Sequence, residues 1–86
     1  MGTDRSEIRD WFNRSKKSGA LFMIVACDTF AHEDYPVDVG PGEDVEAKVN
    51  ELSDPNKMSR VMEVYCLSMD REAQLAEHRA WHLTAT

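Results

Sequence analysis

The histidines are the residues whose type and spacing come closest to forming a metal site. His78 and His82 stand one helical turn apart, so in a helix their imidazoles lie on the same face. Neutral imidazoles at this spacing bind zinc and other divalent metals. His32 and Asp28, which follow the most apolar run of the chain, complete a candidate metal set with this pair. The glutamate of an HExxH motif is absent, and two histidines on a wet helix face explain the same spacing.

A thiol and three carboxylates follow the same apolar run and offer other chemistry. The stretch CDTFAHEDYP, residues 27–36, contains Cys27, Asp28, Glu33 and Asp34. The neighbouring carboxylates raise the pKa of the Cys27 thiol and so disfavour a nucleophilic thiolate. The carboxylates suit acid–base hydrolysis or the binding of hard cations, although their spacing matches no calcium loop. A polar hairpin connection, in which Asp28 makes a local side-chain-to-backbone turn, explains the same residues.

The sequence contains none of the common catalytic signatures. No Walker, Rossmann or nucleophile-elbow pattern occurs in it. Gly40-Pro41-Gly42 precedes a predicted helix, but Glu43 and Asp44 occupy the positive helix end where a phosphate would bind. We therefore assign no catalytic residue and expect a non-enzymatic protein, with a metal-dependent hydrolytic site as the alternative.

The elements that must position these groups follow from the spacing of apolar residues. This spacing predicts three helices and three strands in the order αββαβα. The first strand is apolar on both faces and is expected at the centre of the sheet, whereas Pro36 lacks an N–H and places the second strand at an edge. The predicted ranges are 4–17, 43–52 and 70–83 for the helices, and 21–27, 35–40 and 58–67 for the strands.

These elements predict one α+β domain that spans residues 1–86. We expect a two-layer sandwich in which a three-stranded mixed sheet of order 2-1-3 is packed with helices. A right-handed crossover makes the third strand parallel to the second and antiparallel to the first. Cys27 and Cys66 then lie at opposite ends of the sheet, too far apart for a disulfide. The third helix runs back toward the loop after the first strand, so its two histidines are expected to approach that loop.

The predicted third helix also presents a candidate interaction face. Its alanines, together with Met69 and Leu83, form a stripe that is expected to pack on the core. The opposite side mixes apolar, aromatic and charged side chains, a composition typical of interfaces. The interaction candidates are Arg71, Leu75, His78, Trp81 and His82 on this helix, together with Glu33 and Asp34 of the acidic segment.

The charge of the chain indicates which partners it suits. The net charge is −6, and the acids gather in residues 28–54, where Lys48 is the single base. Such a surface suits a protein partner with a basic surface and disfavours direct binding to nucleic acid. A homodimer formed through the helix face is an alternative.

The apolar runs and the cysteines indicate the compartment. No run is long enough to span a membrane, so no membrane partner is expected. No secretory signal is recognisable at the start, and two thiols without such a signal are expected to stay reduced. We therefore expect a cytoplasmic protein with no cofactor, or with zinc or another divalent metal if the metal site exists.

Three segments together resemble a known group of proteins. The segments FMIVACDTFAHEDYPV, VMEVYCLSMD and LAEHRAWH are similar to those of short uncharacterised bacterial and phage-borne proteins. The resemblance covers most of the chain from about Gly19 onward and transfers no function to particular residues. It implies a self-standing domain and, through the association with phages and mobile elements, a role in binding a host protein.

Overall fold

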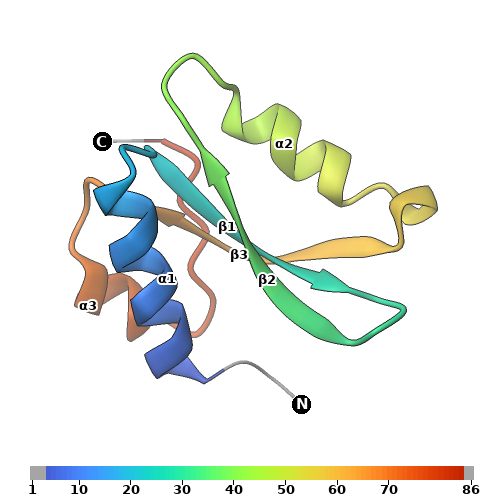
Figure 1. The fold of residues 1–86 in the computed structure, drawn as a ribbon, viewed down its shortest axis with the longest axis horizontal. Coiled ribbons are helices and arrows are strands. Elements are labelled where there is room, and N and C mark those ends of the chain that lie inside the picture. Colours follow the sequence, from blue (N-terminus) through green and yellow to red (C-terminus); the bar gives the residue numbers. More distant parts are fainter. Residues whose placement is uncertain (1–3, 85–86) are drawn as a thin grey trace.

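The chain folds into the predicted αββαβα order, shown in Figure 1. The computed structural model describes residues 4–84, apart from the side chain of Pro55. A short 3₁₀ helix, η1, precedes the last strand and was not predicted. The elements are α1 (Arg5–Lys17), β1 (Phe22–Asp28), β2 (Glu33–Val39), α2 (Val45–Leu52), η1 (Pro55–Lys57), β3 (Ser59–Cys66) and α3 (Arg71–Leu75).

The sheet has three strands in the order β2-β1-β3, which confirms the predicted order. β1 pairs antiparallel with both of its neighbours. The predicted mixed sheet is wrong, because β2 and β3 run in the same direction but are separated by β1 and never pair. In this topology β1 is flanked on both sides, and the edge strand β2 carries Pro36 as expected.

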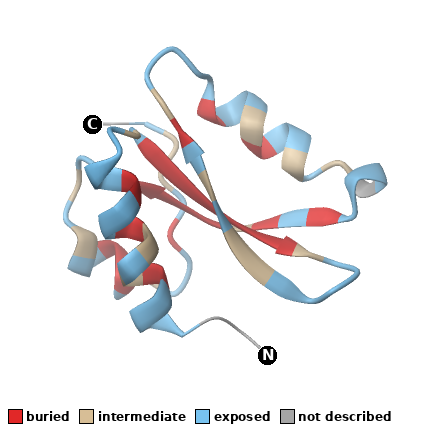
Figure 2. Cartoon of the chain, viewed as in Figure 1, coloured by how far each residue is buried: buried red, intermediate tan, exposed pale blue. Residues whose placement is uncertain are grey.

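Helices cover both faces of the sheet, so the predicted two layers are in fact three (Figure 1). Side chains of β1 alternate between two hydrophobic cores: Met23 and Val25 pack toward α1 and α3, whereas Phe22 and Ile24 pack toward α2. Figure 2 shows β1 buried along nearly its whole length between these helices. A strand that is apolar on both faces needs a cover on each face, which is the physical reason for the third layer.

α1 forms as the sequence predicts. The carboxylate of Asp4 accepts a hydrogen bond from the backbone N–H of Ser6 and caps the helix. Ile8 and Phe12 are buried against the sheet, and the ring of Phe12 meets that of Tyr65 edge to face at 6.2 Å between centroids. This packing holds the middle of α1 against the C-terminal end of β3.

The third helix is much shorter than predicted. α3 ends at Leu75 after five residues, and the chain then turns and runs beside β3, where Trp81 forms a parallel bridge with Val64. The N–H of Val64 donates to the carbonyl of Ala80 at 2.9 Å, and the N–H of His82 donates to the carbonyl of Val64 at 3.0 Å. Backbone groups of the C-terminal segment thus form hydrogen bonds with the outer edge of β3. In a longer helix the same groups would have formed hydrogen bonds within the helix.

The side chain of Gln74 forms hydrogen bonds with the same edge of β3, at the C-terminal end of the strand. Its side-chain oxygen accepts from the N–H of Cys66 at 2.8 Å, and its side-chain nitrogen donates to the carbonyl of Cys66 at 2.9 Å. The side chain is 1% exposed and so takes the place of a neighbouring strand at this position. The predicted core stripe is therefore wrong in its middle: α3 buries Gln74 and Leu75, while Ala73 and Ala76 are exposed. Ala80 is buried, and Met69 and Leu83 pack against the core, as predicted.

Candidate functional site

The predicted metal set is not brought together. Asp28 ends β1 and His32 lies in the turn that follows, whereas His82 lies beside β3 and its ring nitrogen is 2.7 Å from the carboxylate of Glu77. His78 and His82 are not one helical turn apart, because the chain is not helical after Leu75. Within residues 4–84, no group of three His, Cys, Asp or Glu side chains is arranged to hold a metal ion. The structure therefore gives the metal hypothesis no site.

The predicted interaction face of the third helix does not form either. Leu75, expected at the surface, is 7% exposed and packs in the core with α1. Arg71 donates to the side-chain oxygen of Asn13 at 2.7 Å and so helps to hold α3 against α1. Trp81 is 40% exposed, but it lies on the extended segment with the guanidinium of Arg79 4.3 Å from its ring.

The turn between β1 and β2 is held by Asp28, as the sequence predicts. Its carboxylate accepts from the N–H groups of Phe30 at 2.9 Å and Ala31 at 3.2 Å. Its carbonyl accepts from the N–H of His32 at 2.7 Å, and His32 closes the turn in the left-handed conformation with φ 58°. The role shown for Asp28 is structural, and the turn has a defined shape.

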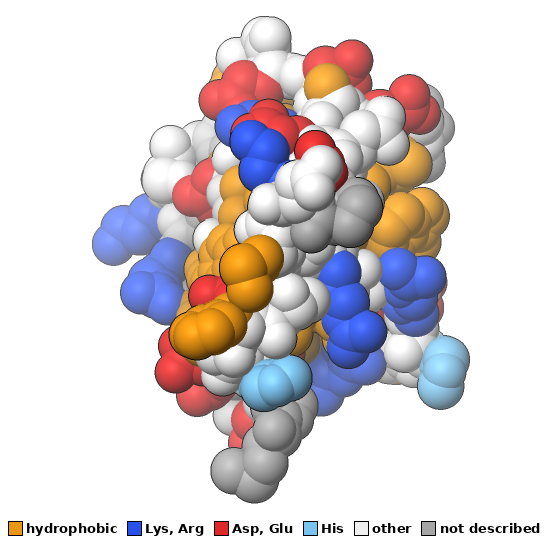
Figure 3. Space-filling model, turned by 90° about the vertical axis from the view of Figure 1, so that its right-hand side faces the viewer, with side chains coloured by type: hydrophobic (Ala, Val, Ile, Leu, Met, Phe, Trp, Pro, Cys, Tyr) orange, Lys and Arg blue, Asp and Glu red, His pale blue; other side chains and the backbone are white. Residues whose placement is uncertain are grey.

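This turn presents an apolar surface that the sequence analysis missed. Phe30 is 77% exposed and Met58, in the loop before β3, is 51% exposed. The N–H of Thr29 donates to the carbonyl of Met58 at 2.9 Å, which joins the two loops at one end of the sheet. We call Phe30 and Met58 the hairpin patch. Figure 3 looks onto the side of the molecule that carries η1 and this turn, and hydrophobic side chains lie at its surface among acidic, basic and histidine side chains.

Acidic residues lie close to the hairpin patch along the chain. Asp28 precedes the turn, and Glu33 and Asp34 begin β2 directly after it, with Glu33 exposed. Two of the predicted interaction candidates, Glu33 and Asp34, thus lie at this end of the sheet and not near Trp81. The signal that the sequence offered for the patch was a single phenylalanine in an otherwise polar turn.

The two cysteines are free and buried, as predicted. Cys27 is opposite Arg60 and Cys66 is opposite Phe22, so the thiols lie at opposite ends of the β1–β3 pair. Burial raises the pKa of the Cys27 thiol, and hydrogen bonding to Asp34 raises it further, against the opposing effect of Arg60. A thiol with a raised pKa stays protonated and is a poor nucleophile.

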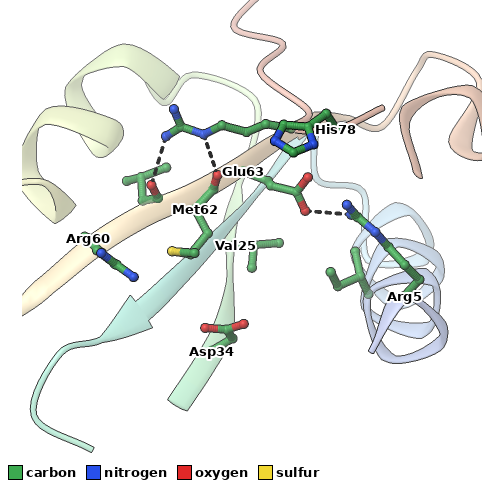
Figure 4. A pocket seen from close by; sticks show the side chains of 10 residues that line it. Arg5, Val25, Asp34, Arg60, Met62, Glu63 and His78 are labelled. Atoms are coloured by element: carbon green, nitrogen blue, oxygen red, sulfur yellow. Dashed lines mark hydrogen bonds and ion pairs between the residues drawn. The ribbon is translucent and has the colours of Figure 1, made fainter. Parts of the chain in front are cut away.

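A pocket of about 610 Å³ opens on the α1 side of the sheet (Figure 4). Residues from α1, all three strands and the segment after α3 line it. Its floor is apolar and its rim is charged. The lining consists of Arg5, Ile8, Val25, Asp34, Arg60, Val61, Met62, Glu63, His78 and Arg79.

Glu63 is the buried charge of this region, and its hydrogen bonds connect three segments. One of its carboxylate oxygens accepts from the guanidinium of Arg5 and from the hydroxyl of Tyr65, each at 2.8 Å. The other accepts from the N–H of Ala80 at 3.0 Å. Burial, followed by the hydrogen bond to Glu63, raises the pKa of Tyr65 well above its usual value. The carboxylate is thus engaged in holding α1 and the C-terminal segment on β3.

A second arginine–glutamate pair lies at the surface between α1 and α3. The guanidinium of Arg9 donates twice to the carboxylate of Glu72, each time at 3.0 Å, and Arg71 donates once at 2.6 Å. The hydrogen bonds from Arg9 and Arg71 lower the pKa of Glu72 to about 2. This pair is exposed, and in that respect it differs from the Arg5–Glu63 pair.

Comparisons with known proteins add no constraint on the function. No protein-family model matches the sequence, and no match was found among curated proteins or among solved structures. The resemblance to short bacterial and phage-borne proteins thus stays a prediction. Within the described part of the chain, no helix is long and apolar enough to cross a membrane.

Proposed function

We propose that this protein is a small acidic interaction domain that binds another protein, one with a basic surface, through the hairpin patch. The observation that carries the proposal is Phe30, whose side chain is 77% exposed although its backbone is held in a fixed turn. Met58 lies on the neighbouring loop and extends the apolar surface. Exposed apolar patches rimmed by polar residues mark interaction sites.

The rigidity of the turn favours this role for Phe30. Binding costs conformational entropy when a loop has to be ordered, and a preformed turn avoids most of that cost. Asp28 holds the backbone on the side of β1, and the hydrogen bond from Thr29 to Met58 holds it on the side of β3. Aromatic side chains, phenylalanine among them, are enriched at protein–protein interfaces.

The charge of the protein selects the kind of partner. The net charge is −6, and the carboxylates of Asp28 and Glu33 are close to the patch along the chain. Complementary charge accelerates association with a basic surface and disfavours acidic partners. If the resemblance to phage-borne proteins holds, the partner is a host protein, and a nucleic-acid-binding protein offers the basic surface required.

Replacing Phe30 with alanine tests the proposal. Loss of a hot spot weakens binding by about 30-fold or more, so the immobilised F30A variant is expected to lose a basic protein that the unaltered protein retains from cell extract at low salt. High salt is expected to release the same protein. Titration of the identified partner then measures the affinity of each variant.

Leu21→Ala is the matched control for this experiment. Leu21 is 45% exposed and precedes β1 at the end opposite to the turn, so the substitution removes an exposed apolar side chain from another surface. We expect the control to keep the partner. The proposal fails if F30A retains the partner, if both variants lose it equally, or if the retained protein is acidic.

A further inference from the structure

We infer that the pocket on the α1 side of the sheet is a binding site for a small organic anion, a phosphate or carboxylate attached to an apolar body. The pocket is about 610 Å³, within the range of small-molecule sites. Its lining reaches the hairpin end of the sheet through Asp34 and Arg60 but includes neither Phe30 nor Met58, and the inference does not depend on the proposed protein binding. Residues from α1, the sheet and the segment after α3 converge on it, as Figure 4 shows for Arg5, Arg60 and His78.

The charged rim has an excess of positive charge in an otherwise acidic protein. Three guanidinium groups, from Arg5, Arg60 and Arg79, and two carboxylates, from Asp34 and Glu63, line the pocket. Against a net charge of −6 for the whole chain, this is a local reversal of sign. Such a reversal inside a concavity attracts anions, because the low-dielectric walls focus the field.

Glu63 does not compete with an anion, because its oxygens already accept three hydrogen bonds. Arg5 and Tyr65 donate to one oxygen, and the N–H of Ala80 donates to the other. The carboxylate is 10% exposed, and the guanidinium of Arg5, 2.8 Å away, offsets its charge. Asp34, by contrast, belongs to the opposite side of the pocket, on β2 (Figure 4). An anion is therefore expected nearer to β3 and the C-terminal segment than to β2.

Arg79 is held in place without having its charge cancelled. Its Nε donates to the carbonyl of Met62 at 2.8 Å and its Nη2 donates to the carbonyl of Val61 at 3.2 Å, and both acceptors are neutral. A fixed guanidinium loses little side-chain entropy when it meets a ligand. The imidazole of His78, on the preceding residue, is exposed and also lines the pocket.

The floor of the pocket determines the rest of the ligand. Ile8, Val25 and Met62 line it on the α1 face, so a bare inorganic ion would leave apolar surface uncovered. An aromatic or aliphatic body attached to the anion would cover that surface and gain affinity from it. Planar guanidinium groups match the oxygens of a phosphate or carboxylate in pairs. The chemical class that fits both parts is an organic phosphate or carboxylate.

Phenyl phosphate and inorganic phosphate are the probes for a test by NMR titration. We expect phenyl phosphate to cause saturable shifts of the backbone amides of residues 60–63 and 78–79, with affinity at least about threefold above that of inorganic phosphate. The Arg60→Gln variant is expected to bind phenyl phosphate about tenfold more weakly. Arg60 is exposed on β3, so this change is expected to leave the fold intact, and the amide spectrum of the variant shows whether it does.

Arg14→Gln provides the matched control, because it removes the same charge from an exposed position on α1 outside the pocket. The control is expected to bind phenyl phosphate within about twofold of the unaltered protein. Should Arg60→Gln misfold, His78→Gln replaces it as the second pocket variant, with a smaller loss expected. The inference is overturned if the shifts do not saturate, if they map outside the pocket, if both arginine variants weaken binding equally, or if the two probes bind equally well.

Discussion

Replacing Glu63 with alanine is expected to lower the free energy of unfolding by about 3 kcal/mol, because buried donors lose their acceptor. The hydroxyl of Tyr65 and the N–H of Ala80 are buried and donate to Glu63. Arg5 is less affected, since its side chain is 44% exposed and water can hydrate it. Unfolding by urea, followed by tryptophan fluorescence, measures the change.

Two further variants distinguish the contribution of the buried hydrogen bonds of Glu63 to stability from that of its ion pair. Glu63→Gln keeps one oxygen as an acceptor but turns an amide N–H₂ toward the other donors, so its loss is expected to be intermediate. Glu72→Ala breaks an arginine–glutamate pair that is exposed, and it is expected to cost much less than the change at Glu63. Equal losses of unfolding free energy in Glu63→Ala and Glu72→Ala would show that the burial of Glu63 adds nothing to stability. That result would contradict its role in holding α1 and the C-terminal segment on β3.

Replacing Gln74 with alanine is the second large effect, with an expected loss of about 2–4 kcal/mol. The substitution leaves the N–H and the carbonyl of Cys66 without their partner inside the protein and opens a cavity beside β3. The same urea titration measures it. In addition, hydrogen exchange is expected to become faster at the amide of Cys66, because its acceptor is gone.

Gln74→Glu tests whether both halves of the amide matter. An ionised carboxylate can accept from the N–H of Cys66 but cannot donate to its carbonyl, whereas a protonated carboxyl can do both. Burial raises the pKa of a carboxyl in the folded state, so the loss of unfolding free energy relative to the unaltered protein is expected to shrink as the pH falls.

The exposed amide of Asn50 on α2 is the control for Gln74→Ala, and its change to alanine is expected to shift stability by less than about 0.5 kcal/mol. If Gln74→Ala lowers the free energy of unfolding no more than the Asn50 control does, the hydrogen bonds of Gln74 to the edge of β3 do not stabilise the protein, and this account of the edge is refuted.

The arrangement of the sheet could be predicted from the sequence because two local signals agree with the global packing. β1 is apolar at almost every position, which suits a strand with neighbours on both sides and helices on both faces. Pro36 can stand only at an edge, and it does. The number of layers was mispredicted, although the same apolar pattern already requires a cover on both faces.

The end of the chain could not be predicted because tertiary contacts override its helical pattern. The alanine spacing after Asp70 favours a long helix, and no proline or glycine interrupts it. The unpaired edge of β3, however, offers backbone groups that the segment around Trp81 satisfies. The expected histidine pair and the expected exposure of Leu75 failed with that helix.

The candidate sites depend on the same kind of nonlocal information. Phe30 and Met58 are far apart in the sequence, and only the register of the sheet places their loops together. The arginines of the pocket come from the first helix, the third strand and the C-terminal segment, so no local sequence motif contains them together. Sequence reasoning did identify Glu33, Asp34 and His78 as surface groups of interest, but it assigned the histidine to a helix face that does not exist.

Photo-crosslinking from position 30 tests the central claim, that the hairpin patch is a protein-binding surface, most directly. A photoreactive phenylalanine analogue replaces Phe30 in one sample and Leu21 in a second, and each is irradiated in cell extract at low salt. We predict that the position of Phe30 yields one major adduct with a basic protein, which unlabelled protein suppresses by competition and the F30A variant does not. Equal adducts from both positions, or no adduct specific to the position of Phe30, would contradict the account.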